Sequence, residues 1–303
     1  MASLRSKGIR LLVKLFVSRL LSTKITPQVQ RKRFEKASFP LWRSFKFASE
    51  AVDIEGVPAE LVVAEGASKK RVILYLHGGA YTFGSPRTHT DLSSGLSHFA
   101  KMSVLIVDYR LAPEHPYPAA LDDSTKAYKW LLKQDYKPEN IIIAGDSAGG
   151  GLTLATMLKL RDQGEILPAA GVCLSPWVDL CCQADSYTKL DKLDPLLSTN
   201  WLQEMAKFYI QDEDPRTPYI SPLYGDFKGL PPIMIQVGSD EVLLDDSIKL
   251  EKRLREDGVE VELKVYQDMW HVWQLFSAIL PEGKEALVEI AEFVNAKITA
   301  TAS

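Results

Sequence analysis

An apolar strand pattern passes directly into a glycine-rich helix start in Ile141-Ile142-Ile143-Ala144-Gly145-Asp146-Ser147-Ala148-Gly149-Gly150-Gly151-Leu152. The β-branched residues predict a buried strand, and Gly-x-Ser-x-Gly at its end is the pattern of a nucleophile elbow. Such a tight turn has no room for side chains two residues before and after the serine, where Gly145 and Gly149 stand. A glycine-rich phosphate cradle or an ordinary strand-to-helix turn would give the same short motif, so the surrounding sequence must decide.

Strand patterns alternate with helical periodicity on both sides of this motif. The alternation predicts an α/β fold with a mostly parallel central sheet flanked by helices, whose ligands bind at the carboxyl ends of the strands. Strand patterns occur at residues 44–53, 59–64, 71–76, 103–108, 140–145, 169–174, 232–238 and 259–266. Helical periodicity occurs at residues 118–134, 148–162, 243–257 and 284–297.

The composition is that of an ordinary globular protein with one large core. The chain has 303 residues, of which 46% are hydrophobic and 25% charged, and its net charge of -3 gives no general attraction to nucleic acid. Three cysteines, two of them adjacent, offer no disulfide framework and fit a reducing cytoplasm.

The first 36 residues are strongly basic. They hold ten Lys or Arg against Glu35, a net charge of +9, so the rest of the chain sums to -12. No uncharged run between Lys7 and Lys24 exceeds four residues, which is too short for a signal peptide or a membrane span. An apolar stripe at helical spacing predicts an amphipathic helix, which we expect to pack on the protein itself rather than on an anionic membrane. The stripe is made of Ile9, Leu12, Val13, Phe16, Val17, Leu20 and Leu21.

A long connection interrupts the alternation between residues 176 and 230. It contains a helical piece at 198–211 between proline-rich stretches, and a connection of this length inside a compact domain is usually functional. We expect a helical cap formed by residues 1–45 and 176–225. The catalytic core would then comprise residues 46–175 and 226–303.

A serine hydroxyl needs a general base and an acid that orients the base. In this architecture the order along the chain is serine, acid, histidine. Only His271 of the five histidines follows Ser147, and it lies just after a predicted strand. Asp240 and Glu241 both follow the strand at 232–238, and their position alone cannot separate them. Asp179 is a third candidate for the acid.

The negative charge that develops on a tetrahedral intermediate requires backbone N–H donors. Gly78, Gly79 and Ala80 follow the strand at 71–76 and can supply them, together with Ala148 directly after the serine. A glycine pair after a strand is more often an ordinary turn, and only its combination with the elbow and His271 favours an oxyanion hole.

The motifs taken together resemble those of carboxylesterases of the hormone-sensitive-lipase family of α/β-hydrolases. The resemblance covers roughly residues 70 to 275. It rests on Leu76-His77-Gly78-Gly79-Ala80-Tyr81, Asp108-Tyr109-Arg110-Leu111-Ala112-Pro113-Glu114, His115-Pro116-Tyr117-Pro118-Ala119-Ala120, Gly145-Asp146-Ser147-Ala148-Gly149-Gly150, Glu241-Val242-Leu243-Leu244-Asp245-Asp246 and His271.

The resemblance implies a cap over the sheet and hydrolysis of esters with short to medium acyl chains, without metal or cofactor. Family members often carry Asp-Pro-Leu-x-Asp-Glu with the first aspartate catalytic, and this position aligns without a gap with Glu241. Ala80 replaces a commoner third glycine, but its N–H donates equally well. The stretch from Tyr109 to Glu114 and the side chain of His77 are interpreted as structural supports of the oxyanion loop.

The hypothesis is therefore a cytoplasmic serine carboxylesterase in which Ser147 attacks a small ester, His271 moves the proton and Glu241 orients His271. The alternatives are a non-catalytic small-molecule receptor on the same scaffold and a membrane-surface lipase docked by the basic helix. A homodimer is possible. The candidate residues for the acyl pocket are Trp42, Trp177, Leu202, Phe208 and Trp273. Apolar and aromatic residues of this kind more often belong to the protein core than to a pocket.

Overall fold

The computed structural model describes residues 3–37 and 45–301. Within them the chain forms an eight-stranded sheet in the order β1-β2-β4-β3-β5-β6-β7-β8. β2 is antiparallel to both of its neighbours, and the other strands are parallel. The strands are β1 Phe47–Ile54, β2 Val57–Ala64, β3 Ser68–Leu76, β4 Met102–Val107, β5 Ile141–Asp146, β6 Ala170–Leu174, β7 Ile233–Gly238 and β8 Val261–Tyr266. The predicted α/β fold with a mostly parallel sheet is confirmed.

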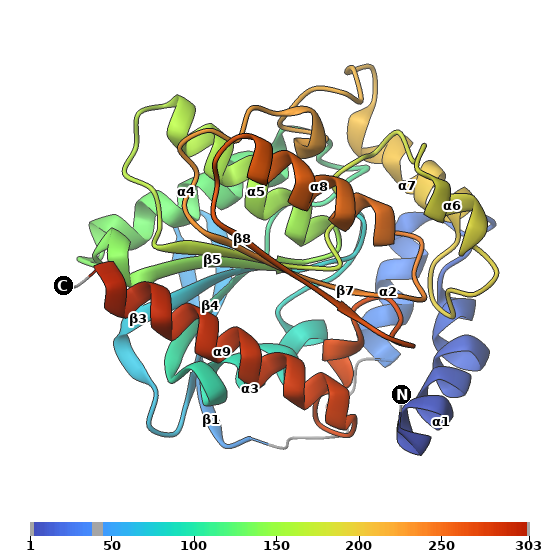
Figure 1. Cartoon of the computed structure of the whole chain (residues 1–303), viewed down its shortest axis with the longest axis horizontal. Coiled ribbons are helices and arrows are strands. Elements are labelled where there is room, and N and C mark those ends of the chain that lie inside the picture. Colours follow the sequence, from blue (N-terminus) through green and yellow to red (C-terminus); the bar gives the residue numbers. More distant parts are fainter. Residues whose placement is uncertain (1–2, 38–44, 302–303) are drawn as a thin grey trace.

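Helices cover both faces of the sheet (Figure 1). On one face lie α3 and α9, and on the other lie α4, α5 and α8, while α1, α2, α6 and α7 gather at one end of the sheet. The bounds are α1 Leu4–Leu12, α2 Pro27–Ala37, α3 Thr90–Ala100, α4 Ala119–Lys133, α5 Ala148–Asp162, α6 Asp185–Lys189, α7 Thr199–Ile210, α8 Leu244–Glu256 and α9 Pro281–Thr301.

The central strands are buried on both faces because their side chains alternate between two cores. In β3, Leu74 belongs to the core under α4, α5 and α8, whereas Ile73 and Tyr75 belong to the core under α3 and α9. In β5, Ile143 and Ile142 divide in the same way. This two-sided burial explains why both strands read as continuous apolar runs.

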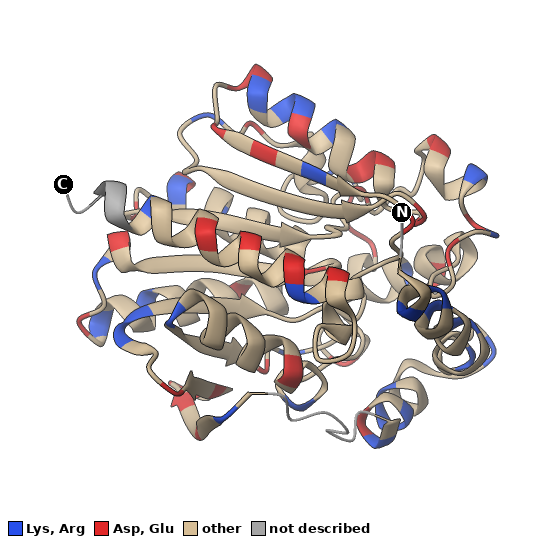
Figure 2. Ribbon diagram, turned by 60° about the horizontal axis from the view of Figure 1, so that its bottom comes forward, with Lys and Arg blue, Asp and Glu red and all other residues tan. Residues whose placement is uncertain are grey.

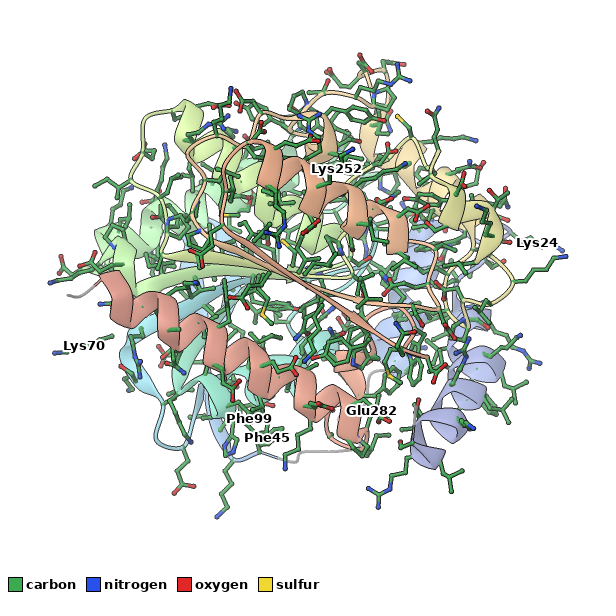
Figure 3. All side chains as sticks on the ribbon, viewed as in Figure 1. Lys24, Phe45, Lys70, Phe99, Lys252 and Glu282 are labelled. Carbon is green, nitrogen blue, oxygen red and sulfur yellow. The ribbon has the colours of Figure 1, made fainter. Side chains whose placement is uncertain are left out.

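Helix α3 is absent from the predicted helices, although Leu92, Leu96 and Phe99 recur at helical spacing. It is rich in serine and contains Gly95, both of which disfavour a helix interior. Its stability comes from packing: a Cβ at Gly95 would lie 2.7 Å from Leu287 Cδ1 of α9. Phe99 also meets Phe45 edge to face, with ring centroids 5.4 Å apart (Figure 3). Tertiary contacts therefore form this helix where local propensity does not.

The N-terminal helix packs on the protein, but not along the whole predicted stripe. Ile9 and Val13 are buried in a cluster with Trp270 and other residues near β8. Leu12, in α1, is 55% exposed and Phe16 is 62% exposed. A π-helical turn at Val13–Val17 shifts the angular register of Phe16 relative to Ile9. The single stripe expected from the sequence is therefore wrong for Leu12 and Phe16.

Helices α1 and α2 carry much of the basic charge expected from the sequence, and Figure 2 shows Lys and Arg on both of them. Ser3 caps the start of α1 and donates from its N–H to Glu282 Oε1 of α9 at 2.7 Å. Figure 3 labels Glu282 at the start of α9, near α1. None of the helices in the described part of the chain is long and apolar enough to cross a membrane.

Candidate active site

Ser147 occupies the sharp turn between β5 and α5. Its backbone has φ +54° and ψ -122°, a conformation that residues with a side chain rarely adopt. The turn is held by hydrogen bonds from Ser147 N to Leu174 O at 2.8 Å and from Trp177 N to Ser147 O at 2.9 Å. A Cβ at Gly149 would lie 1.9 Å from Leu76 O. The strand, turn and helix expected of a nucleophile elbow are thus present, and position 149 sterically requires glycine.

His271 lies in the loop after β8 and contacts Glu241. The distance from His271 Nδ1 to Glu241 Oε2 is 2.7 Å, and both side chains are buried. Glu241 Oε1 accepts two further hydrogen bonds of 2.7 Å, from Gly238 N and from Ser175 Oγ. The glutamate side chain, which is longer than the aspartate common in the family, is therefore held at both carboxylate oxygens, and Oε2 faces the imidazole.

Ser175 was not identified from the sequence. It directly follows β6 with φ +44°, donates to Glu241 and accepts from Val272 N at 3.2 Å, so it links the acid to the histidine loop. The only available signal is its place at the carboxyl end of a predicted parallel strand, a position where functional side chains gather.

Charge around the imidazole favours its protonated form. Burial opposes that form, but the hydrogen bond and negative charge of Glu241 raise the pKa of His271 above its usual value. The charges of Asp194 and Asp146 act in the same direction. Burial in turn raises the pKa of Asp194 to about 6. His271 therefore stands among three carboxyl groups that stabilise an imidazolium.

The other two acid candidates have different partners. Asp240 forms an ion pair with Arg10 of α1 and accepts from Ser239 Oγ at 2.8 Å. Asp179 accepts from Cys181 N and from Tyr224 Oη at 3.0 and 3.1 Å. Of the three acidic residues considered, Glu241 is the one hydrogen-bonded to His271.

The glycine loop after β3 reaches the elbow. Gly78 N donates to Asp146 Oδ1 at 3.0 Å, and this carboxylate also accepts from Tyr75 Oη at 2.7 Å. Gly78 therefore has its N–H engaged and is not a free oxyanion donor, contrary to its place in the predicted set. Within the described chain, the N–H groups of Gly79, Ala80 and Ala148 donate to no protein acceptor.

His77 and Tyr109 support this loop from below. Their rings stack with centroids 4.2 Å apart, and Tyr109 Oη donates to His77 O at 2.6 Å. Burial, helped by the neighbouring His89, lowers the pKa of His77 to about 3. A neutral, enclosed imidazole at this place fits the structural role expected for His77.

Ser147, His271 and the glycine loop face one cavity of about 370 Å³. Its wall is largely apolar, and the turns that follow α1 contribute Val17, Leu20 and Leu21 to it, while α2 and α7 contribute further residues. Trp177, Leu202 and Trp273 lie in the cores instead, Phe208 packs against a core, and Trp42 lies outside the described residues. The aromatic residues that line the cavity are Phe34, Phe83, Trp201 and Phe276.

Comparison with known proteins agrees with the fold and with the family that the motifs resemble. A family model for the α/β-hydrolase fold matches residues 73–275. An acetyl-hydrolase of Streptomyces hygroscopicus is 45% identical over 258 residues, which cover 82% of this chain and 86% of that protein.

Two solved structures match almost the whole chain. An esterase of the bacterial hormone-sensitive lipase family is 42% identical, with a TM-score of 0.93 and coverage of 98% of this chain and 99% of that one. EstE5, in a crystal soaked with p-nitrophenyl butyrate, is 41% identical, with a TM-score of 0.93 and coverage of 98% and 100%. The resemblance inferred from the motifs is confirmed. The chain belongs to the α/β-hydrolase family, and within it is a carboxylic ester hydrolase of the hormone-sensitive-lipase type.

Proposed function

We propose that the protein hydrolyses its ester through an acyl-enzyme on Ser147. The observation that carries the proposal is the 2.7 Å contact between Glu241 and His271 in a cavity that Ser147 also lines. His271 Nε2 takes the proton of the attacking hydroxyl and passes it to the leaving alcohol, while Glu241 orients the ring and stabilises its positive charge. Water then attacks the acyl-enzyme by the same route.

The oxyanion is assigned to the N–H groups of Gly79, Ala80 and Ala148. Their positions around the cavity support the assignment, since Gly79 and Ala80 line it and Ala148 follows the nucleophile. Donors already in place cost no reorganisation as the charge develops, and each is worth about 10²–10³ in rate.

Short to medium acyl chains are the proposed substrates. The cavity of about 370 Å³ is near the lower end of ligand sites, which span roughly 300–1,000 Å³. The relative named acetyl-hydrolase and the EstE5 crystal soaked with a butyrate ester point in the same direction. Initial rates on p-nitrophenyl esters from acetate to laurate test this, and a maximum at laurate would contradict it.

The cap is assigned to residues 1–45 and 176–225, of which 1–2 and 38–44 lie outside the described residues. Their helices α1, α2, α6 and α7 lie together at the end of the sheet where β5 delivers Ser147 (Figure 1). Residues 46–175 and 226–303 are assigned to the catalytic core.

The proposed location is the cytoplasm, and the free cysteines support it. The packing of Ile9 and Val13 on the protein supports a cap helix rather than a membrane contact. Light scattering in solution tests for a homodimer.

Ser147→Ala tests the proposal directly. Removal of the nucleophile is expected to lower kcat on p-nitrophenyl butyrate by a factor approaching 10⁶. Thermal unfolding should show that the variant remains folded. A variant with a tenth of the parent rate would show that Ser147 is not the nucleophile.

A further inference from the structure

Arg10 of α1 lies where three loops around the site meet. Its Nη1 forms an ion pair with Asp240 and is 3.4 Å from Asp268 O, and its Nη2 donates to Leu193 O at 2.9 Å. Arg10 and Asp240 are only 23% and 17% exposed, so water screens their attraction less than on an open surface. A planar guanidinium with several fixed donors suits such a junction better than a lysine.

Each acceptor of Arg10 closely precedes either His271 or a residue that acts on its imidazole. Asp240 is followed by Glu241, the hydrogen-bond partner of the imidazole. Leu193 is followed by Asp194, whose charge also favours the imidazolium. Asp268 stands three residues before His271 itself. The side chain of Arg10 therefore contacts all three loops, in each case a few residues before the group that acts at the site.

Further hydrogen bonds join the loops that Arg10 contacts to one another and to the loop of His271. Asp194 Oδ2 accepts from Val242 N at 3.1 Å, which ties the loop of Asp194 to the residue after Glu241. Asp240 N donates to Met269 O at 3.0 Å, which ties the acid loop to the histidine loop. Small displacements of reacting groups are costly to catalysis, so a contact that holds these loops together affects the rate without touching substrate.

We propose that Arg10 is a positioning residue that aligns Glu241 and Asp194 with His271, so that the N-terminal helix controls the efficiency of the catalytic groups. The inference rests on the proposed function. It also gives Asp240, which does not contact the histidine, a role as the anchor for Arg10.

The test compares Arg10→Met, Asp240→Asn and the double variant. The double variant removes one charge of each sign, so a change that persists in it reflects lost alignment rather than altered charge. On p-nitrophenyl butyrate it is expected to lower kcat about ten- to a hundredfold, with KM changed less than about threefold. The acid limb of the pH profile should also move to lower pH. The charged groups that face His271 are Glu241, Asp194 and Asp146. In the double variant Glu241 and Asp194 are held less closely to the imidazole, so they stabilise its protonated form less.

Arg161→Met is the matched control for lost stability. Arg161 is 25% exposed and its Nη1 donates to Asp226 O and to Lys228 O, but it lies near the end of α5, about 20 Å along the helix from Ser147. Thermal unfolding and circular dichroism accompany each assay. Arg161→Met is expected to keep the parent kcat even where its melting temperature falls as far as that of the Arg10 variants.

A double variant with the parent kcat and acid limb would overturn the role of Arg10. Equal losses of kcat in Arg161→Met and Arg10→Met at equal melting temperature would overturn it as well, because the effect would then follow stability. If Ser147→Ala remained active, the proposed function itself would fail. An inactive Ser147→Ala together with an unaffected double variant would remove only the inference about Arg10.

Discussion

Replacement of Glu241 by glutamine should disable the base while leaving the fold intact. Gly238 N and Ser175 Oγ both donate to Oε1, so the amide oxygen of the new side chain is expected to stay with these two donors. Its NH₂ group then faces His271 Nδ1, where the carboxylate oxygen accepted a hydrogen bond of 2.7 Å. Two donors cannot face each other, so the imidazole proton moves to Nε2, the atom that must accept the serine proton.

The size of the loss follows from the tautomer. The corresponding change of acid to amide in a serine protease lowers kcat by about 10⁴, which equals about 5 kcal/mol of transition-state stabilisation. The buried imidazole also loses the charge that raises its pKa, so the acid limb of the residual activity should move to lower pH.

The assay is kcat and kcat/KM on p-nitrophenyl butyrate between pH 5 and pH 9, with thermal unfolding as the check of folding. Asp240→Asn is the matched variant, because it changes the neighbouring carboxylate, which binds Arg10 and not the histidine. It should keep at least about a tenth of the parent kcat, since it affects alignment and not the tautomer. A Glu241→Gln enzyme within tenfold of the parent, with Asp240→Asn inactive, would refute the assignment of the acid.

Two further predictions concern the elbow and the pH profile. Gly149→Ala should lower the free energy of unfolding by about 3 kcal/mol, because its Cβ would lie 1.9 Å from Leu76 O; Gly8→Ala, with no atom within 4 Å, should leave it unchanged or raise it by up to about 1 kcal/mol. Urea unfolding measures both, and equal effects would contradict the steric argument. Because the base must be neutral and the pKa of His271 is raised, the acid limb of kcat/KM in the parent enzyme should have its midpoint above about pH 6.5. A midpoint below pH 6 would show that the carboxylates do not act on the imidazole as described.

Local sequence patterns predicted the central strands well because those strands are buried on both faces. Such strands must be continuously apolar, whatever packs on them, and β5 shows this most clearly. Helix α3 was missed because its serines and Gly95 disfavour a helix, a preference that packing against α9 outweighs. The patterns also failed at Leu12 and Phe16, and at Phe16 the reason is a π-helical turn that changes the angle between residues expected to share a face.

The oxyanion donors illustrate a second limit of sequence patterns. Gly78 and Gly79 are identical residues in one motif, but Gly78 N donates to Asp146 and Gly79 N does not. Asp146 is 68 residues away along the chain. A motif indicates which backbone segment approaches the nucleophile, whereas the direction of each N–H depends on φ and ψ and on acceptors from other strands.

The sequence by itself determined the fold, the position of Ser147 and the choice of His271. These follow from local steric requirements and chain order: a tight turn after a strand needs Gly145 and Gly149, and one histidine follows the serine. Chain position left Asp240 and Glu241 equal and the family resemblance favoured Glu241, but only the tertiary structure shows which of the two contacts His271, since adjacent loop residues point in different directions according to their partners. Glu241 turns to a serine at the end of β6 and to the histidine after β8, and Asp240 turns to Arg10, 230 residues earlier. Partners so distant in sequence meet only when the sheet and the N-terminal helix have assembled.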